Sequence, residues 1–270
     1  MRNYTAIDFP LRLFECKMQA FGLQTIGYAV DSDNEAALIK SFAEAWERIW
    51  FSKLVKQEHG PKNSNGFAAG STNEMALENA EQELIERAML LKAWQTQVGW
   101  NKTSLSSFKL KMIQFALWLK GWRLQVFDLN SNLGQVKCFF ASHSDRGLIF
   151  DSCFVKTRKE SEIKGVYSIL KCIALPKITK MDELPAKAKP VDHARFYANP
   201  GNLKAIEFLN LQIKKDTTIE LENPELINQK LLHEAGEFPA VALCQHPTWP
   251  KLSWGTNSIQ GANPWPHPLA

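Results

Sequence analysis

The sequence predicts an α+β fold, in which mixed or antiparallel sheets pack against several amphipathic helices. Several long runs place apolar residues at helical spacing, whereas the middle of the chain alternates apolar and polar residues as strands do. The Asn-Ser-Asn-Leu-Gly segment at 130–134 separates two such alternating runs, which is typical of a β-hairpin. The 270 residues, 45% hydrophobic and 22% charged, have the composition of a globular protein with a substantial core.

The first half of the chain predicts three helices. Pro10 breaks any long element in the first 26 residues, which we leave unassigned. Asp33 can cap the first helix, and Thr72 can cap the second, which follows a polar loop that contains glycine. The predicted helices span residues 33–55, 72–95 and 105–119.

The second half predicts a sheet followed by helices and a tail. The predicted strands span residues 123–128, 135–142 and 147–155, and the predicted helices span 161–174, 202–214 and 223–234, with a Lys- and Pro-rich linker at 177–190. From about residue 238 the chain is rich in Pro, Trp and Asn, which favours an extended tail. We expect one domain over residues 1–270, and we expect that residues 264–270 can be deleted without loss of the fold.

Composition and charge argue against several classes of protein. The net charge of +4 is small and the basic residues are spread along the chain, so we expect no nucleic-acid partner. No stretch reaches the ~18 apolar residues of a membrane span and the N-terminus is no signal peptide, so we expect no membrane partner. Five cysteines without Cys-x-x-Cys spacing favour free thiols in a reducing cytoplasm over zinc or disulfides.

The motif Glu-x-x-Glu-Arg occurs twice, once on each of the first two predicted helices, at residues 44–48 and 83–87. Positions i and i+3 share a helix face, so each copy can present two carboxylates beside a guanidinium. Carboxylates from two helices could hold Mg²⁺ ions, which would in turn bind a polyphosphate. The same motif also suits a solvated helix face with local ion pairs, and the residues alone leave both readings open.

A run of small residues precedes the second copy of the motif. Residues 64–71, Ser-Asn-Gly-Phe-Ala-Ala-Gly-Ser, lead directly into the second predicted helix. Small residues allow backbone N–H groups at a helix N-terminus to approach an anion closely. This run is neither a Walker sequence nor a dinucleotide fingerprint.

Together, these residues resemble the YcaO family. Residues 64–89 resemble the family's central signature, in which a Ser-Asn-Gly segment precedes a helix ending in Glu-Leu-Ile-Glu-Arg. Residues 41–48, with Gly27 upstream, resemble its earlier helix. Residues 192–200 resemble its Asp-His…Tyr…Pro segment, and residues 263–270 resemble its proline-rich C-terminus. The four matches occur in the family's order and span nearly the whole chain from residue 27.

The resemblance implies an ATP-dependent, azoline-forming cyclodehydratase component. Such proteins bind ATP and Mg²⁺ without a P-loop and activate a peptide amide oxygen by phosphorylation, so that a Cys, Ser or Thr side chain closes a ring. The implied metal ligands are Glu44, Glu47, Glu83 and Glu86. The implied cofactor-binding residues are Arg48, Arg87, Ser41 and Ser71. Pro268 and the carboxylate of Ala270 are implied at the reacting centre.

The resemblance also implies partners, namely a precursor peptide and a separate protein that recognises its leader. Whether the chain forms a homo-oligomer is left open. Three departures from the family pattern support an alternative, a catalytically reduced scaffold subunit. Lys40 replaces a small hydroxyl residue, Met75 replaces an acid, and residues 163–181 contain no Asp or Glu where a third helix should supply one.

Overall fold

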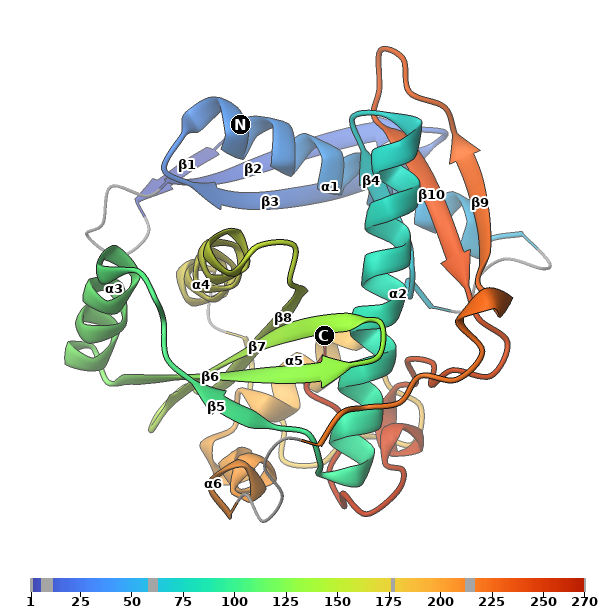
Figure 1. Ribbon diagram of the computed structural model, residues 1–270. Coiled ribbons are helices and arrows are strands. Elements are labelled where there is room, and N and C mark those ends of the chain that lie inside the picture. Colours follow the sequence, from blue (N-terminus) through green and yellow to red (C-terminus); the bar gives the residue numbers. More distant parts are fainter. Residues whose placement is uncertain (1, 6–11, 58–62, 176–177, 212–216, 270) are drawn as a thin grey trace. The chain divides into compact units, whose positions relative to one another are not determined.

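The computed structural model describes residues 2–5, 12–57, 63–175, 178–211 and 217–269 (Figure 1). Within these residues the chain forms two compact units. Unit 1 comprises residues 1–87, 170–175 and 222–251, and unit 2 comprises residues 88–169, 176–221 and 252–270. Each unit is therefore built from three separate segments of the chain. The one-domain organisation expected from the sequence stays a prediction.

The elements are numbered in chain order. The helices are α1 (Asn34–Val55), α2 (Asn73–Thr96), α3 (Phe108–Leu119), α4 (Arg158–Ala174), α5 (Pro190–Tyr197) and α6 (Phe208–Leu211), with 3₁₀ turns η1 (Pro200–Ile206), η2 (Pro224–Leu226) and η3 (Gly255–Ser258). The strands are β1 (Arg2–Thr5), β2 (Arg12–Ala20), β3 (Leu23–Asp31), β4 (Phe67–Gly70), β5 (Asn101–Thr103), β6 (Trp122–Ser131), β7 (Gly134–His143), β8 (Gly147–Phe154), β9 (Asn228–His233) and β10 (Ala240–Gln245).

Unit 1 contains the antiparallel sheet β1-β2-β3, whose region the sequence left unassigned. Phe21 and Gly22 connect β2 to β3 with positive φ angles of 53° and 69°, as a tight hairpin turn requires. Helix α1 packs on β2 and β3, and its N-terminus is capped as predicted, because the Asp33 side chain accepts a hydrogen bond from the Glu35 N–H. A Cβ at Gly27 would lie 2.6 Å from the backbone nitrogen of Ala45, so α1 can approach β3 this closely only over a glycine.

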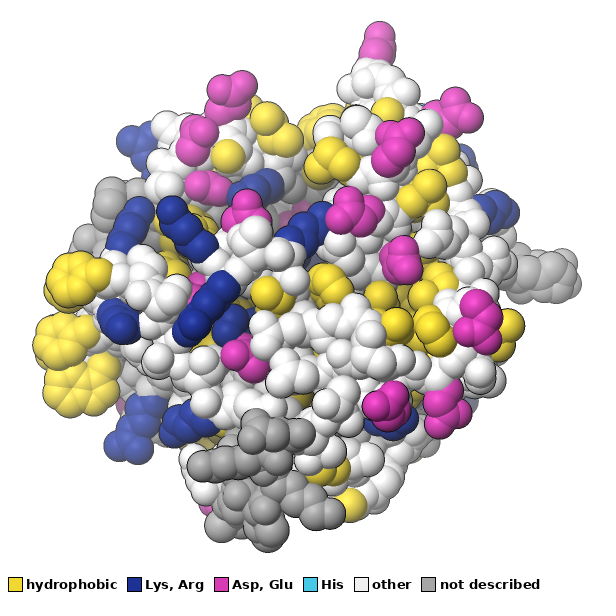
Figure 2. Space-filling model, viewed as in Figure 1, with side chains coloured by type: hydrophobic (Ala, Val, Ile, Leu, Met, Phe, Trp, Pro, Cys, Tyr) yellow, Lys and Arg dark blue, Asp and Glu magenta, His cyan; other side chains and the backbone are white. Residues whose placement is uncertain are grey.

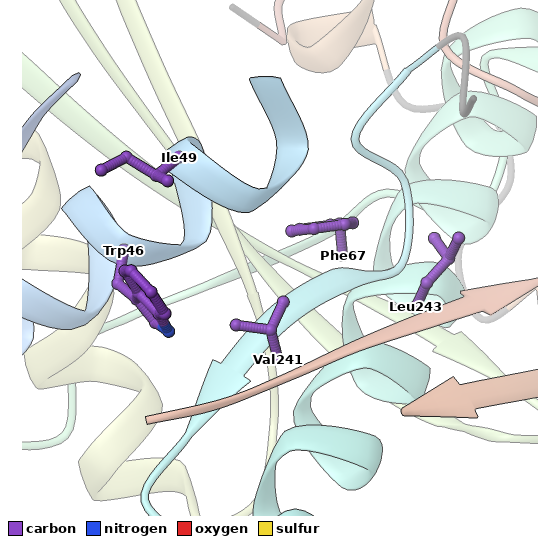
Figure 3. Close-up of a cluster of buried hydrophobic side chains, with 5 residues drawn as sticks. All are labelled: Trp46, Ile49, Phe67, Val241 and Leu243. Atoms are coloured by element: carbon purple, nitrogen blue, oxygen red, sulfur yellow. The ribbon is translucent and has the colours of Figure 1, made fainter. Parts of the chain in front are cut away.

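A second antiparallel sheet of unit 1 has the order β4-β10-β9. Figure 3 shows the buried cluster that joins it to α1, formed by Trp46 and Ile49 of the helix with Phe67, Val241 and Leu243 of the sheet. The predicted helix at 223–234 is wrong, because this segment is η2 followed by strand β9. Pairing of β9 with β10 satisfies the backbone of these residues and overrides their local helical pattern.

Unit 2 is built on the antiparallel sheet β5-β6-β7-β8, with α3 packed on β6. The predicted hairpin is confirmed, with Ser131 opposite Gly134 at its turn. The predicted helix at 161–174 and strand at 147–155 are confirmed as α4 and β8. The segment 202–214, predicted as one helix, instead forms η1 and the short helix α6, which ends at residue 211. Residues 212–214 of the predicted helix lie outside the described residues.

The C-terminal segment is part of the core of unit 2. The indole N–H of Trp94 donates to the carbonyl of Trp265 at 3.0 Å, and the Tyr197 hydroxyl donates to the carbonyl of Pro266. The ring of His193 is hydrogen-bonded to the carbonyl of His267 at 2.9 Å. Deleting residues 264–270 should therefore destabilise unit 2, contrary to the expectation from the sequence. Among the described residues, none of the helices combines the length and apolar character of a membrane crossing.

Candidate functional site

Unit 1 contains the first Glu-x-x-Glu-Arg motif at the middle of α1. The carboxylate of Glu44 accepts hydrogen bonds from the backbone N–H of Tyr28 on β3 at 2.6 Å and from the guanidinium of Arg48 at 2.7 Å. The same guanidinium donates to the carbonyl of Ile26 at 2.7 Å. Glu44 and Arg48 thus form the local ion pair that the sequence allowed, and both also anchor α1 to β3.

One residue of β4, Ala69, forms hydrogen bonds to both α1 and α2. The N–H of Ala69 donates to the Glu47 carboxylate at 3.2 Å, and the Ala69 carbonyl accepts a hydrogen bond from the Asn79 side chain on α2 at 3.0 Å. Gly70 lets β4 lie against the first turn of α2, since a Cβ there would be 2.7 Å from the carbonyl carbon of Met75. The run of small residues found in the sequence therefore brings backbone groups up to both helices.

The second motif lies on α2. Arg87 lies between its two glutamates, with 3.6 Å from its Nε to a Glu83 oxygen and 3.6 Å from its Nη1 to a Glu86 oxygen. Glu86 is buried, whereas Glu83 keeps about a quarter of its side chain exposed. At this position the guanidinium offsets the charge of both carboxylates.

Carboxylates from the two helices interact at Glu47. Burial of its carboxyl group, followed by the negative charges of Glu83 and Glu44, raises the pKa of Glu47 from its ordinary 4.5 to about 8. The hydrogen bond from Ala69 and the charge of Arg48 oppose this change without cancelling it. Residue Glu47 is partly exposed to solvent, but its carboxyl group is surrounded by protein. Glu47 thus experiences the negative charge of a carboxylate on its own helix and of one on α2.

The residues present fit Mg²⁺ with few protein ligands. Their donors are carboxylate oxygens, which Mg²⁺ prefers, and a bound cation would relieve the repulsion felt at Glu47. In the described part of the chain, no group of three or more Asp, Glu, His or Cys side chains is arranged so that it could hold a metal ion. Mg²⁺ characteristically takes only one or two carboxylates, with water and phosphate completing its shell.

A buried polar atom next to this region is also left without a hydrogen bond. The side-chain oxygen of Asn65 has no hydrogen-bond partner among the described residues. The next residue, Gly66, lies against α2, where a Cβ would be 3.1 Å from Cβ of Leu84. Because an unsatisfied buried oxygen is costly, it is a candidate acceptor for a bound ligand.

The two serines of the predicted site have structural partners. Ser41 is buried and donates to the carbonyl of Leu38 at 2.9 Å, one turn earlier in α1. Ser71 is exposed, and its hydroxyl lies 3.0 Å from the sulfur of Met75. Met75, at the position where the resemblance implies an acid, has 44% of its surface exposed. The binding roles of Ser41 and Ser71 stay predictions.

Sequence reasoning missed the groups that come from distant segments. Lys171, in the part of α4 that belongs to unit 1, has its ammonium 3.8 Å from Glu44. It lies within the acid-free stretch 163–181, so a cation approaches the site from the helix where the resemblance implies a carboxylate. The backbone N–H groups of Tyr28 and Ala69 were missed as well, because a sequence motif does not reveal them. Pro268 is buried in unit 2, Ala270 lies outside the described residues, and their roles stay predictions.

A comparison with family models gives one match. The model described as YcaO cyclodehydratase, ATP- and Mg²⁺-binding, matches residues 50–155. The match includes β4, α2 and the whole sheet β5-β6-β7-β8. None of the curated proteins matches the chain.

Solved structures share the fold at low sequence identity. YcaO from Methanopyrus kandleri bound with AMPPCP and Mg²⁺ is 10% identical, with a TM-score of 0.63 over 91% of this chain and 84% of that one. A chain of the E. coli microcin synthetase McbBCD complex is 10% identical, with a TM-score of 0.61 over 92% and 91%. The heterocyclase TruD is 16% identical, with a TM-score of 0.51 over 79% of this chain and 33% of that one. The fold implied by the sequence resemblance is thereby confirmed.

Proposed function

We propose that the chain is a member of the YcaO family, which the family model over residues 50–155 supports, and that it binds Mg-ATP on α1 and α2 to activate an amide of a ribosomally made precursor peptide. Ring closure to an azoline would follow, as in the cyclodehydratases for which the family model is described. The observation that carries the proposal is the convergence of Glu44, Glu47 and Glu83 from two helices, which raises the pKa of Glu47 to about 8 through burial and repulsion between like charges.

The protein's contribution to such a reaction is positioning. Bound ATP and Mg²⁺ would supply a transferable phosphoryl group and neutralise its charge. The glutamates would hold the cation, and Glu47 would lose its proton when the cation arrives. Arg87 would turn its planar guanidinium from the glutamates to a phosphate. Tyr28 and Ala69 fix two of the carboxylates through backbone N–H groups, so their orientation does not depend on flexible side chains.

Lys171 would provide positive charge from a third element. Its ammonium lies 3.8 Å from the Glu44 carboxylate and would offer a hydrogen-bond donor to a phosphate bound there. A lysine there also lowers the net negative charge of the site, which weakens attraction for a second metal ion. We therefore propose a site with fewer metal-binding acids than the resemblance implies.

The alternative is a catalytically reduced scaffold subunit of a peptide-modifying complex. Two observations favour it. Met75 offers no carboxylate, and Glu44 is engaged by Tyr28, Arg48 and Lys171. In this reading, the carboxylates and cations of unit 1 would neutralise one another and hold the helices together without binding ATP.

Calorimetric titration with ATP in the presence and absence of Mg²⁺ separates the two readings. We expect the wild type to bind ATP only with Mg²⁺ and Glu83→Gln to bind at least about tenfold more weakly, a difference of ~1.4 kcal/mol. Glu78→Gln is the matched control, because Glu78 lies on the same helix, is exposed and accepts a hydrogen bond from Gln82 one turn later; this substitution should leave the affinity unchanged. If the wild type shows no Mg²⁺-dependent binding at millimolar ATP, the proposed ATP-dependent function is wrong and the scaffold subunit remains.

We also propose that the protein works in the cytoplasm with a precursor peptide and a separate docking protein. Five cysteines without a disulfide among the described residues support a reducing compartment. The McbBCD complex with bound pro-MccB17 is one solved assembly of this fold with a peptide, which supports the choice of partners.

A further inference from the structure

Helix α3 of unit 2 is apolar on two opposite faces. One face packs on β6 and is buried, with side chains Leu110, Ile113 and Leu117. The other is open to solvent, with side chains Phe108 (78% exposed), Met112 (48%), Phe115 (51%) and Leu119 (66%). Isolated exposed apolar residues are ordinary, but four in line on one helix form a continuous stripe that marks an interaction surface.

The spacing of this exposed stripe identifies the kind of partner. Its members follow one another at intervals of four, three and four residues, which is the a/d spacing of a coiled-coil heptad. An a/d stripe is narrower than the apolar face of a helix that packs on a core or lies in a membrane surface. Trp118 stands beside the stripe, with its ring stacked on that of Phe115 at 5.7 Å between centroids. The stripe therefore suits another helix.

The charges beside the stripe identify the chemistry of that helix. Lys109 and Lys111 occupy the e and g positions that flank an a/d seam, and neither forms an ion pair with a residue that the structure describes. Residues 88–127 contain no Asp or Glu but include six basic residues, counting these two. Figure 2 shows hydrophobic side chains protruding where α3 lies in Figure 1, with Lys and Arg side chains near them.

We propose that this face of α3 binds an amphipathic helix of a partner protein, with apolar residues at heptad spacing flanked by acidic ones. A second copy of this chain fits poorly, because pairing α3 with itself would bring its flanking lysines together. The helix is 12 residues long, or about 18 Å, so the partner needs roughly three turns. The inference goes beyond the proposed ATP chemistry and does not depend on it.

Binding of designed peptides to the full-length chain tests the proposal. The probe is a labelled 21-residue peptide with Leu at a and d and Glu at e and g, and the matched peptide has Lys in place of Glu. Fluorescence anisotropy should show at least about tenfold tighter binding of the Glu peptide. The double variant Phe108→Ser, Phe115→Ser should lose at least tenfold of this affinity. Ile39→Ser removes an equally exposed apolar side chain from α1 and should change nothing.

A second experiment reverses the charge of the flanking lysines and decides whether they select the peptide. Lys109→Glu with Lys111→Glu should invert the preference, so that the Lys peptide binds more tightly than the Glu peptide. All substituted side chains are exposed, and thermal melting checks that each variant folds. Equal binding of the two peptides, or an unchanged preference after charge reversal, overturns the proposal. Binding to phosphatidylglycerol vesicles without peptide binding would instead indicate a membrane surface, and dimerisation abolished by Phe115→Ser would indicate a second copy. Either result overturns it.

Discussion

Glu47 is the residue at which pH, metal binding and stability are coupled. Because its pKa rises from 4.5 to about 8 on folding, by burial and then by the charges of Glu83 and Glu44, the native carboxyl holds its proton where the unfolded one has lost it. Its contribution to stability is therefore full below pH 4.5 and lost as pH rises towards 8. Without metal, Glu47→Gln should raise the free energy of unfolding at pH 8 by on the order of 1–3 kcal/mol, and by nearly nothing at pH 4.5. Urea unfolding at the two pH values measures this, and a pH-independent difference would contradict it.

Met75 is the residue at which the site departs most clearly from the family pattern. Its side chain is 44% exposed in the first turn of α2, so a glutamate there would have access to solvent. The dipole of α2 would also favour a negative charge at this end of the helix. If Met75 marks a lost metal ligand, Met75→Glu should tighten Mg²⁺-dependent ATP binding about tenfold, or ~1.4 kcal/mol. Met75→Gln has the same shape without the charge and should not. Equal affinities of the two variants in calorimetry would show that the site does not need this acid.

At the scale of elements, the packing of α1 on β3 sets the positions of Glu44 and Glu47. Gly27→Ala should place a methyl group against the backbone of α1 and lower the free energy of unfolding by about 1–3 kcal/mol. Weaker ATP binding should accompany this loss, because Glu44 is held by the neighbouring Tyr28 N–H. Gly236→Ala is the matched control, since a Cβ there has no heavy atom within 4 Å. Similar urea midpoints for both variants would show that α1 adjusts without strain.

The elements also show what a sequence can and cannot predict. Helices α1 and α2 and the hairpin β6–β7 were predictable, since caps, periodicity and turn residues are local. Strand β9 was not, because only its pairing with β10 decides its conformation. The local motif also led to the prediction that Glu44, Glu47, Glu83 and Glu86 bind the metal, which stays a prediction. The approach of Lys171 to Glu44, by contrast, depends on a contact between distant segments.

At the scale of the whole molecule, the proposed site lies in unit 1, so a ligand should protect that unit first. At a concentration of Mg-ATP 100 times its Kd, binding should stabilise the folded site by about 2.7 kcal/mol. Hydrogen exchange followed by mass spectrometry should then show slower exchange in β3, β4 and the first half of α2, which carry Tyr28, Ala69 and Asn79. The sheet β6–β7–β8 is the internal reference. Protection confined to that sheet would place the ligand elsewhere.

The three-segment composition of unit 1 has a consequence for biosynthesis. Strand β4 is among the earlier segments to leave the ribosome, but its partner β10 begins only at Ala240. While the intervening residues are being translated, the apolar side chain of Phe67 cannot yet pack against Val241 and Leu243. A nascent chain in this state exposes an unpaired strand edge, which is a hazard for aggregation. We therefore expect expression of this protein to depend on chaperones that hold nascent chains, and slower translation to increase that dependence.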